Sequence, residues 1–322
     1  MLAEAGTYTF SVQAIDRNLN YSEPASVTLT VVLPFYLRAS FLVPTIAGGT
    51  LLMALLVIQA LVLLKRRRQV FAYQRLAVEE LADARRVQMG LMPEVAPEIE
   101  GLEIAGRCVS ANTVGGDFFD YLQGSNEIAI VVGDVTGHGM QGAMNAVMTD
   151  GVLKATAKAQ VHLSPARLMT ELNEVLIDQM EEQMNVTMVI GLINGVAKKL
   201  TLANAGHHAH PQLLRNGQLT PLLAKGMPLG MMAGISYQQI EFQLQSGDVV
   251  VFMTDGIIEA KDSAGQEYQE TDRLSHVLAQ FTSADTSAEA MVTALINDAT
   301  IFGTDMTPEE EDDITVVVVK VL

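Results

Sequence analysis

The apolar positions of the chain change period several times, and each change predicts a different kind of element. Residues 7–16 (TYTFSVQAID) alternate between apolar and polar side chains as a half-buried strand does, and residues 26–33 (SVTLTVVL) form a second β-rich run. The segment between them is rich in turn-forming residues. Because two strands alone do not make a stable sheet, we interpret residues 1–34 as the end of a larger β-sandwich.

A run of 24 residues without a charged side chain, residues 41–64, predicts a transmembrane helix. A buried helix of a globular domain seldom stays apolar on every face over such a length. Residues 65–68 (KRRR) follow directly, whereas the other flank has only Arg38 nearby. Because Lys and Arg accumulate on the cytoplasmic side, we expect a single-pass protein of the cell membrane, with residues 65–322 in the cytoplasm and residues 1–40 outside.

The next segment, residues 65–92, is charged and predicts a juxtamembrane linker helix that ends before Pro93. Positions seven apart form a weak heptad, less apolar than that of a stable coiled coil, at Val70, Ala77, Ala84 and Leu91. Two interpretations stay open. The helix pairs with a second copy in a homodimer, or it is a lone linker.

Residues 93–322 predict one domain in which strands and helices alternate. The expected strands are residues 128–132, 186–193, 199–203, 249–253 and 314–321, and the expected helices are residues 142–159, 164–184 and 288–301. The strands are rich in Val, Ile and Leu and apolar on both faces, which is typical of two stacked sheets covered by helices. We therefore expect an α+β fold.

Charge and cysteine content exclude several functions. The net charge is −17, and residues 91–322 alone hold 31 acidic and 11 basic side chains, a net of −20. Such a charge repels phosphate backbones, so nucleic-acid binding is not expected as the main activity. The single cysteine, Cys108, excludes an internal disulfide and a Cys-rich zinc site.

Aspartates recur where the predicted strands begin or end. Asp134 and Asp255 each follow an apolar run, Asp312 and Asp313 precede one, and Asp117 follows a pair of glycines. Converging carboxylates ionise together only when cations neutralise them, and oxygen ligands without Cys or paired His favour Mg²⁺ or Mn²⁺. A single Asp of this kind is more often a turn or cap residue, but the repeated pattern predicts a metal site.

Seven segments between residues 85 and 322 carry a family resemblance. They are RRVQMGLMPEV, VGGDFFDY, GDVTGHG, LANAGHHAHPQLL, GMPLGM, VVFMTDGIIEA and DDITVVVVKV. Their order and spacing resemble the SpoIIE/RsbU-like branch of the PPM metal-dependent serine/threonine phosphatases. The resemblance implies two stacked antiparallel β-sheets flanked by helices, with two Mn²⁺ or Mg²⁺ ions at one edge. It also implies hydrolysis of phosphoserine or phosphothreonine by a metal-activated water.

The same resemblance implies a set of metal ligands by motif position. They are Asp117, Asp134, Asp255, Asp312 and the backbone carbonyl of Val135. Asp313 stands where the family often has a second polar residue, so it ranks below Asp312. His138 is a minor candidate for proton transfer near the ions, although a histidine in a turn is an equal interpretation.

Two further segments resemble parts of known proteins. GTYTFSVQAIDRNLNYSEPASVTLTVV, followed by a membrane span, resembles the triple-tyrosine module that closes many propeller-type bacterial sensors. This implies an extracytoplasmic sensor ahead of the membrane. The histidines of GHHAHP, at His207, His208 and His210, could be a zinc site, but HHxH from one short loop has poor tetrahedral geometry. The phosphatase resemblance identifies this block as a family loop.

We compare three candidate functions for this protein. The first is a membrane-anchored phosphatase whose partner is a phosphorylated STAS-type regulator, an anti-sigma factor antagonist, as the resemblance implies. The second is a diguanylate cyclase, because GGDFF nearly matches the cyclase hairpin; Phe118, however, stands where that chemistry needs an acidic residue. The third is a catalytically silent interaction module, against which the intact carboxylates argue.

Overall fold

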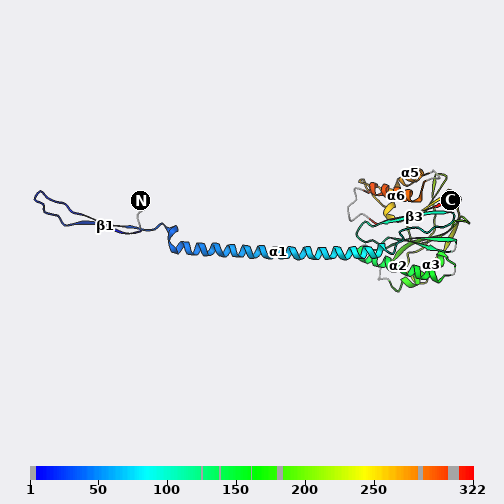
Figure 1. The fold of residues 1–322 in the computed structure, drawn as a ribbon, viewed down its shortest axis with the longest axis horizontal. Helices are drawn as coiled ribbons and strands as arrows, with labels where there is room; N and C mark the ends of the chain where they lie inside the picture. Colours follow the sequence, from blue (N-terminus) through cyan, green and yellow to red (C-terminus); the bar gives the residue numbers. More distant parts are fainter. Residues whose placement is uncertain are drawn as a thin grey trace. The chain divides into compact units, whose positions relative to one another are not determined.

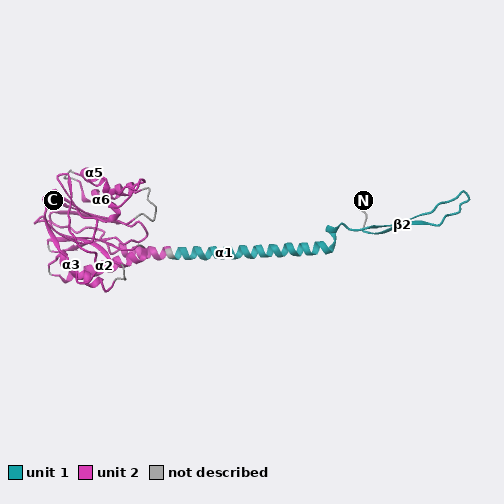
Figure 2. Ribbon diagram, turned by 180° about the vertical axis from the view of Figure 1, so that it is seen from behind, with its two compact units in different colours: residues 1–76 teal, residues 77–322 magenta. Residues whose placement is uncertain are grey.

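The computed structural model describes residues 5–124, 126–137, 139–160, 162–179, 184–281, 286–303 and 312–322. The chain divides into two compact units, residues 1–76 and residues 77–322, which Figure 2 shows in different colours. Each unit is described by itself below.

Unit 1 contains a β-hairpin. Strands β1 (Gly6–Val12) and β2 (Ala25–Val31) pair antiparallel, so that both β-rich runs of the sequence form strands. Nearly all of their side chains are exposed, including the apolar Phe10 at 58% and Val12 at 70%. A short 3-10 helix, η1 (Phe35–Leu37), follows the hairpin.

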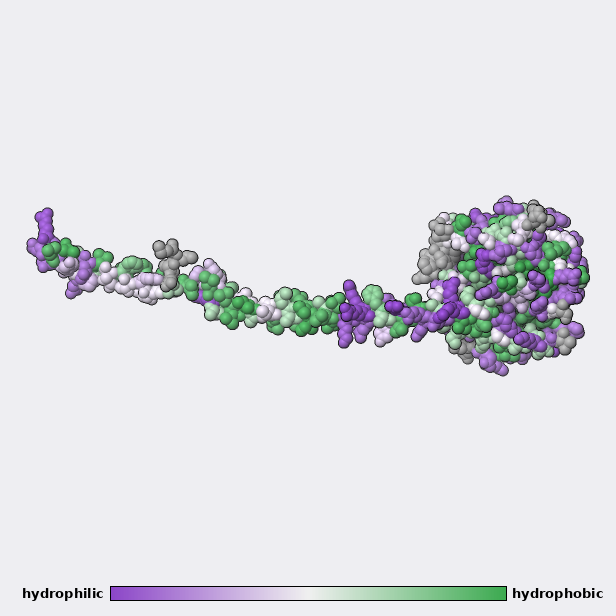
Figure 3. Space-filling view, in the orientation of Figure 1, coloured by the Kyte–Doolittle hydropathy of each residue, from purple (hydrophilic) through white to green (hydrophobic). Residues whose placement is uncertain are grey.

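Helix α1 (Ala39–Met89) combines two segments that the sequence analysis separated. It runs without a break through the predicted membrane span, residues 41–64, and the predicted linker, residues 65–92. By length and composition the helix could cross a membrane, with a mean hydropathy of 2.4 in its most apolar window. In Figure 3 this window is a green band followed by a purple, hydrophilic one.

Both ends of α1 differ slightly from prediction. The helix begins at Ala39, two residues before the predicted span, and Pro44 lies in its second turn. It ends at Met89, three residues earlier than predicted, where Gly90 follows and donates its N–H to the Arg86 carbonyl. The compact unit 2 begins at residue 77, within the helix.

The remaining elements all belong to unit 2. The strands are β3 (Leu102–Val109), β4 (Phe118–Gln123), β5 (Glu127–Val135), β6 (Val186–Asn194), β7 (Lys199–Ala205), β8 (Gln212–Arg215), β9 (Gln218–Pro221), β10 (Gln239–Gln243), β11 (Val249–Met253) and β12 (Ile314–Val321). The helices are α2 (Gly139–Ala159), α3 (Pro165–Leu176), α4 (Asp255–Ile258), η2 (Tyr268–Glu270), α5 (Arg273–Ala279) and α6 (Ala288–Phe302).

Within the described residues, the strands of unit 2 form two five-stranded antiparallel sheets. The order is β10-β7-β6-β5-β4 in one sheet and β3-β12-β11-β8-β9 in the other. Figure 1 shows α2 and α3 on one outer side of the sheets and α5 and α6 on the other. The predicted α+β fold of two stacked sheets flanked by helices is therefore confirmed.

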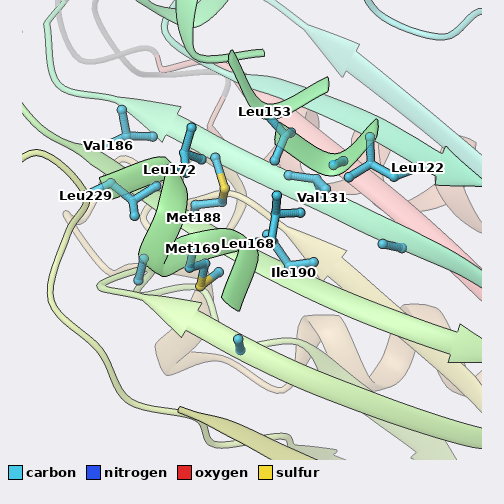
Figure 4. Close-up of a cluster of buried hydrophobic side chains, with 14 of the residues drawn as sticks. Leu122, Val131, Leu153, Leu168, Met169, Leu172, Val186, Met188, Ile190 and Leu229 are labelled. Carbon is cyan, nitrogen blue, oxygen red and sulfur yellow. The ribbon is translucent and has the colours of Figure 1, made fainter. Parts of the chain in front are cut away.

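Three hydrophobic layers hold these elements together. The first lies between α2, α3 and the inner strands β5 and β6, and Figure 4 shows ten labelled members such as Leu153, Leu172 and Ile190. The second lies between α6 and the strands β11 and β12, and the third lies between the two sheets. Side chains alternate along a strand, so Val316 and Val318 face the helix layer while Val317 and Val319 face the other sheet. This explains why the strands read as apolar on both faces.

The predicted elements differ from the observed ones mainly at their ends. The bounds of β11 and β12 are as predicted, and β5, β6 and β7 are one to four residues longer. Helix α3 ends at Leu176, well before the predicted residue 184. The short strands β8, β9 and β10 were not predicted, because runs of four or five residues with exposed polar positions carry little periodicity.

Candidate metal centre

Asp117 joins the two sheets at one edge. It immediately precedes β4, which belongs to one sheet. Its Oδ2 accepts hydrogen bonds from the hydroxyl of Thr254 at 2.6 Å and from that of Thr315 at 2.8 Å. Thr254 directly follows β11 and Thr315 lies in β12, two strands of the other sheet. The Asp117 side chain is buried, with 3% of the residue exposed. The two threonines also bond to each other, since Thr315 donates its N–H to Thr254 Oγ1 at 2.9 Å. Asp117 is thus fixed in position by residues far away in sequence.

Asp313 holds the loop that carries Asp117. Its Oδ1 accepts the N–H of Ala111 at 2.9 Å, and its Oδ2 accepts the N–H of Asp117 at 3.4 Å. A Cβ on Gly115 would lie 1.6 Å from Oδ2 of Asp313, so the first glycine of the GGD motif leaves room for this carboxylate. Both oxygens therefore bond to the backbone of the loop.

Gly116 brings the loop against the end of β5. A Cβ on Gly116 would lie 2.6 Å from the carbonyl oxygen of Val135 and 3.2 Å from Oδ1 of Asp134. The N–H of Val135 in turn donates to the carbonyl of Gly116 at 3.3 Å. Only a residue without a side chain allows the Val135 carbonyl and the Asp134 carboxylate to approach so closely.

The acidic residues lie close enough to act on one another. Burial, followed by the charges of the nearby Asp255, Asp312 and Asp313 carboxylates, raises the pKa of Asp134 to about 7. Burial is also the main cause of the raised pKa of Asp117, followed by the charge of Asp134. Burial and the charge of Asp255 raise the pKa of Asp312. Folding thus gathers four separate strand ends at one acidic edge.

Each predicted ligand lies at a strand end or a helix start. Asp134 and Val135 are the last two residues of β5, and Asp255 is the first residue of α4, directly after β11. Asp312 lies just ahead of β12. His138 lies outside the described residues, so its prediction stays untested.

The donor set fits a hard divalent cation, although the side chains do not stand at coordinating positions. Throughout the described ranges, no three His, Cys, Asp or Glu side chains form a group that could hold an ion as placed. The donors at this edge are carboxylate oxygens and one backbone carbonyl, the ligands that Mg²⁺ and Mn²⁺ take. The glycine turn leaves the Val135 carbonyl and the Asp134 carboxylate uncovered by a Cβ.

A cleft of about 380 Å³ opens beside this edge. It is bounded by small or apolar side chains together with one proposed ligand, namely Val109, Ala111, Gly256, Ala260, Ala299 and Asp312. The cleft gives a ligand larger than a water molecule access to Asp312.

Several residues at the site were not found from the sequence. Gln88 near the end of α1 is buried; its Nε2 donates to the Gly115 carbonyl at 2.7 Å and its Oε1 accepts the Gly115 N–H at 3.3 Å. Thr254 and Thr315, which bond to Asp117, were also missed. His207 was considered only as a zinc ligand, but its two ring nitrogens bond to Thr187 and to the Met253 carbonyl. None of these contacts has a signal in local sequence.

Two stacked antiparallel sheets between helices, with carboxylates at one edge, define the PP2C-type phosphatase fold. The SiaA-PP2C domain of Pseudomonas aeruginosa superposes with a TM-score of 0.66 at 19% identity, covering 77% of this chain and 98% of that one. The catalytic domain of the phosphatase PstP, solved with two manganese ions, superposes with a TM-score of 0.51 at 17% identity, covering 69% of this chain and 98% of that one.

The chain belongs to the SpoIIE family. Residues 124–322 match the family described as Stage II sporulation protein E. The chain is 27% identical over 187 residues to the phosphoserine phosphatase RsbU of Bacillus subtilis (strain 168), which is 58% of this chain and 55% of that relative. The match therefore spans about half the length of the relative. The predicted SpoIIE/RsbU-like resemblance is confirmed. The family match does not support the diguanylate cyclase alternative, and of GGDFF only Phe118 and Phe119 lie in strand β4.

Proposed function

We propose that this protein is a metal-dependent protein phosphatase that hydrolyses phosphoserine or phosphothreonine. The observation that carries the proposal is the gathering of Asp117, Asp134, Asp255 and Asp312 from separate strand ends at one edge of the sheets, where burial and neighbouring carboxylates raise the pKa of Asp134. Groups that repel one another in this way are stabilised by bound cations. Family membership and the RsbU relative support the same chemistry.

The proposed ligands are those that the motif positions imply. Asp117, Asp134, Asp255, Asp312 and the carbonyl of Val135 hold two Mn²⁺ or Mg²⁺ ions. Such ions, when bound, supply a water of lowered pKa and neutralise charge on the phosphoryl oxygens. The PstP domain with two manganese ions supports this count.

The other residues of the site position these ligands. Thr254 and Thr315 orient the Asp117 carboxylate through its Oδ2, which leaves Oδ1 for an ion. Asp313 ties the loop to the start of β12 by accepting two backbone N–H groups.

The proposed substrate is a phosphorylated STAS-type regulator, an anti-sigma factor antagonist. The name of the RsbU relative, a phosphoserine phosphatase, supports a phosphoserine. The cleft of about 380 Å³ that includes Asp312 supports binding of a group larger than a water molecule beside the proposed ligands.

We also propose that α1 anchors the protein in the cell membrane, with residues 65–322 in the cytoplasm. Support comes from the apolar window of α1 and from the basic residues 65–68 that follow the apolar run. Residues 1–34 then form part of an extracytoplasmic sensor. The exposed heptad positions of α1, such as Val70 at 54%, are available for pairing with a second copy.

The decisive experiment is hydrolysis of p-nitrophenyl phosphate by the full chain in detergent, with and without Mn²⁺. We expect turnover that requires the metal and that Asp255→Ala abolishes. Asp178→Ala is the matched control, because Asp178 is exposed beyond the end of α3. It should retain wild-type turnover.

The same assay separates the remaining alternative. A catalytically silent interaction module would show no Mn²⁺-dependent turnover in the wild type, and this outcome would overturn the proposal. A phosphorylated STAS-domain protein as substrate then tests the narrower claim, by loss of its phosphoserine on a Phos-tag gel.

A further inference from the structure

The NAGH segment forms a turn whose backbone is fixed by one side chain. It lies where the chain leaves β7 in one sheet and crosses to β8 in the other. Asn204 is 2% exposed; its Oδ1 accepts the N–H of His207 at 2.8 Å, and its Nδ2 donates to the carbonyl of His207 at 2.9 Å. The Asn204 amide therefore bonds both backbone groups of His207.

Gly206 completes this turn. Its φ is +71°, and a Cβ at this position would lie 2.6 Å from Cγ and Cδ of Pro228. A side chain would be excluded both by the left-handed backbone and by the proline ring. The turn thus holds His207, which is 3% exposed, between the two sheets.

The imidazole of His207 bonds to one residue of each sheet. Its Nε2 lies 2.9 Å from the carbonyl oxygen of Met253, and because a carbonyl only accepts, Nε2 carries the hydrogen. Nδ1 then accepts the hydroxyl of Thr187 at 3.1 Å. Burial lowers the pKa of His207 to about 4, so that the ring is neutral at physiological pH.

Thr187 and Met253, to which the imidazole bonds, lie beside two proposed metal ligands. Thr187 in β6 pairs with Asp134 across the β5–β6 ladder. Met253 ends β11, immediately ahead of Thr254, which bonds to Asp117, and of Asp255. One imidazole therefore connects the strand end that carries Asp134 to the strand end that carries Asp255.

We propose that His207 is a positioning residue of the metal centre, whose imidazole sets the separation between the Asp134 and Asp255 strand ends. The inference rests on the proposed function. The apolar layer between the sheets holds them together but is not directional, whereas two hydrogen bonds from one rigid ring fix distance and orientation. Contacts of this kind behind the ligands commonly change metal affinity by about 10–100-fold when they are removed.

The test is Mn²⁺ binding to the full chain in detergent, measured by isothermal titration calorimetry, which does not depend on turnover. His207→Asn keeps an acceptor near Nδ1 but cannot reach the Met253 carbonyl, and we expect its Kd for Mn²⁺ to rise at least about tenfold. His207→Gln places an amide N–H near Nε2 and should lose less affinity. Thr187→Val should raise the Kd about threefold through loss of one hydrogen bond, and Thr187→Ser should restore it.

The control separates metal positioning from stability. Arg215→Ala removes the partner of buried Asp248, which lies just ahead of β11, at the end remote from Met253. It should lower the free energy of unfolding without changing the Kd for Mn²⁺. If both His207→Asn and Thr187→Val bind Mn²⁺ with wild-type affinity, the inference is overturned while the proposed function stands. A wild-type chain that binds no Mn²⁺ would overturn the proposed function and the inference with it.

Discussion

The carboxylate of Asp313 occupies the space that a side chain on Gly115 would need. A Cβ on Gly115 would lie 1.6 Å from Oδ2 of Asp313, although the two residues are far apart in sequence. The first glycine of the GGD motif is therefore needed because a side chain there would clash with Asp313, just ahead of β12, and not only because of the turn in which it lies. This relationship and three others lead to testable predictions.

Gly115→Ala should displace Asp313 and distort the loop that carries Asp117. We expect a loss of about 1–3 kcal/mol in the free energy of unfolding, as for other overpacked buried sites, together with weaker Mn²⁺ binding by calorimetry. Gly151→Ala is the control, because Gly151 lies exposed in α2 with no atom within 4 Å of its added Cβ. That variant should gain about 0.5–1 kcal/mol. Equal stability of the two variants would contradict the prediction.

Thr254→Val and Thr315→Val should each weaken Mn²⁺ binding, by about 10-fold or more. The two hydroxyls lower the pKa of Asp117, which burial has raised, so that removing either one favours the protonated carboxyl. Because a proton then competes with the ion, the loss should be larger at pH 6 than at pH 8, measured by calorimetry. Thr293→Val is the control, since Thr293 Oγ1 donates only to the Glu289 carbonyl within α6. A loss that does not depend on pH would contradict this explanation.

Gln88→Glu should weaken the attachment of α1 to the metal-site loop. The substitution keeps an acceptor for the Gly115 N–H but places an oxygen where Nε2 now donates to the Gly115 carbonyl at 2.7 Å. We expect a loss of about 1–3 kcal/mol in the free energy of unfolding, measured with urea by circular dichroism. Val87→Ala, at a neighbouring position that is 61% exposed, should change stability little. A neutral effect of Gln88→Glu would show that the contact is not maintained.

Asp120→Asn should change how stability depends on pH. Burial and, after it, the charge of Asp150 raise the pKa of Asp120 to about 6, although Lys154 at 3.3 Å opposes the shift. Since the folded state then binds more protons than the unfolded state, protonation of Asp120 favours folding. Its contribution to the free energy of unfolding is complete below about pH 4 and is lost as the pH rises through about 6. The variant should match the wild type near pH 4 and exceed it above about pH 7 by roughly 3 kcal/mol, at about 1.36 kcal/mol per pKa unit.

Chemical unfolding at several pH values measures this difference. The charged groups that face Asp120 are Asp150 and Lys154, and Lys154 also donates to the Leu91 carbonyl at 3.0 Å. Asp178→Asn is a suitable control, because Asp178 is exposed. Parallel stability curves for the wild type and Asp120→Asn would refute the prediction.

Much of the fold could be predicted because its signals are local. The long runs of Val in β11 and β12 gave correct bounds, since a strand buried on both faces is continuously apolar. The short edge strands β9 and β10 were missed, because most of their side chains are exposed. Helix α3 was predicted too long, because the residues after Leu176 remain favourable for a helix although the chain turns there.

The sequence by itself determined which residues are acidic, which of them follow strands, and where an apolar helix is long enough for a membrane. Each of these properties depends on neighbours within a few positions. Only the tertiary structure decided what holds those residues in place: Thr254 and Thr315 bond to Asp117 from 137 and 198 residues away. Hydrogen bonds between distant residues depend on how strands pair and sheets stack, and no local pattern encodes the resulting distance. For that reason the candidate ligands were visible in the sequence, whereas the residues that position them were not.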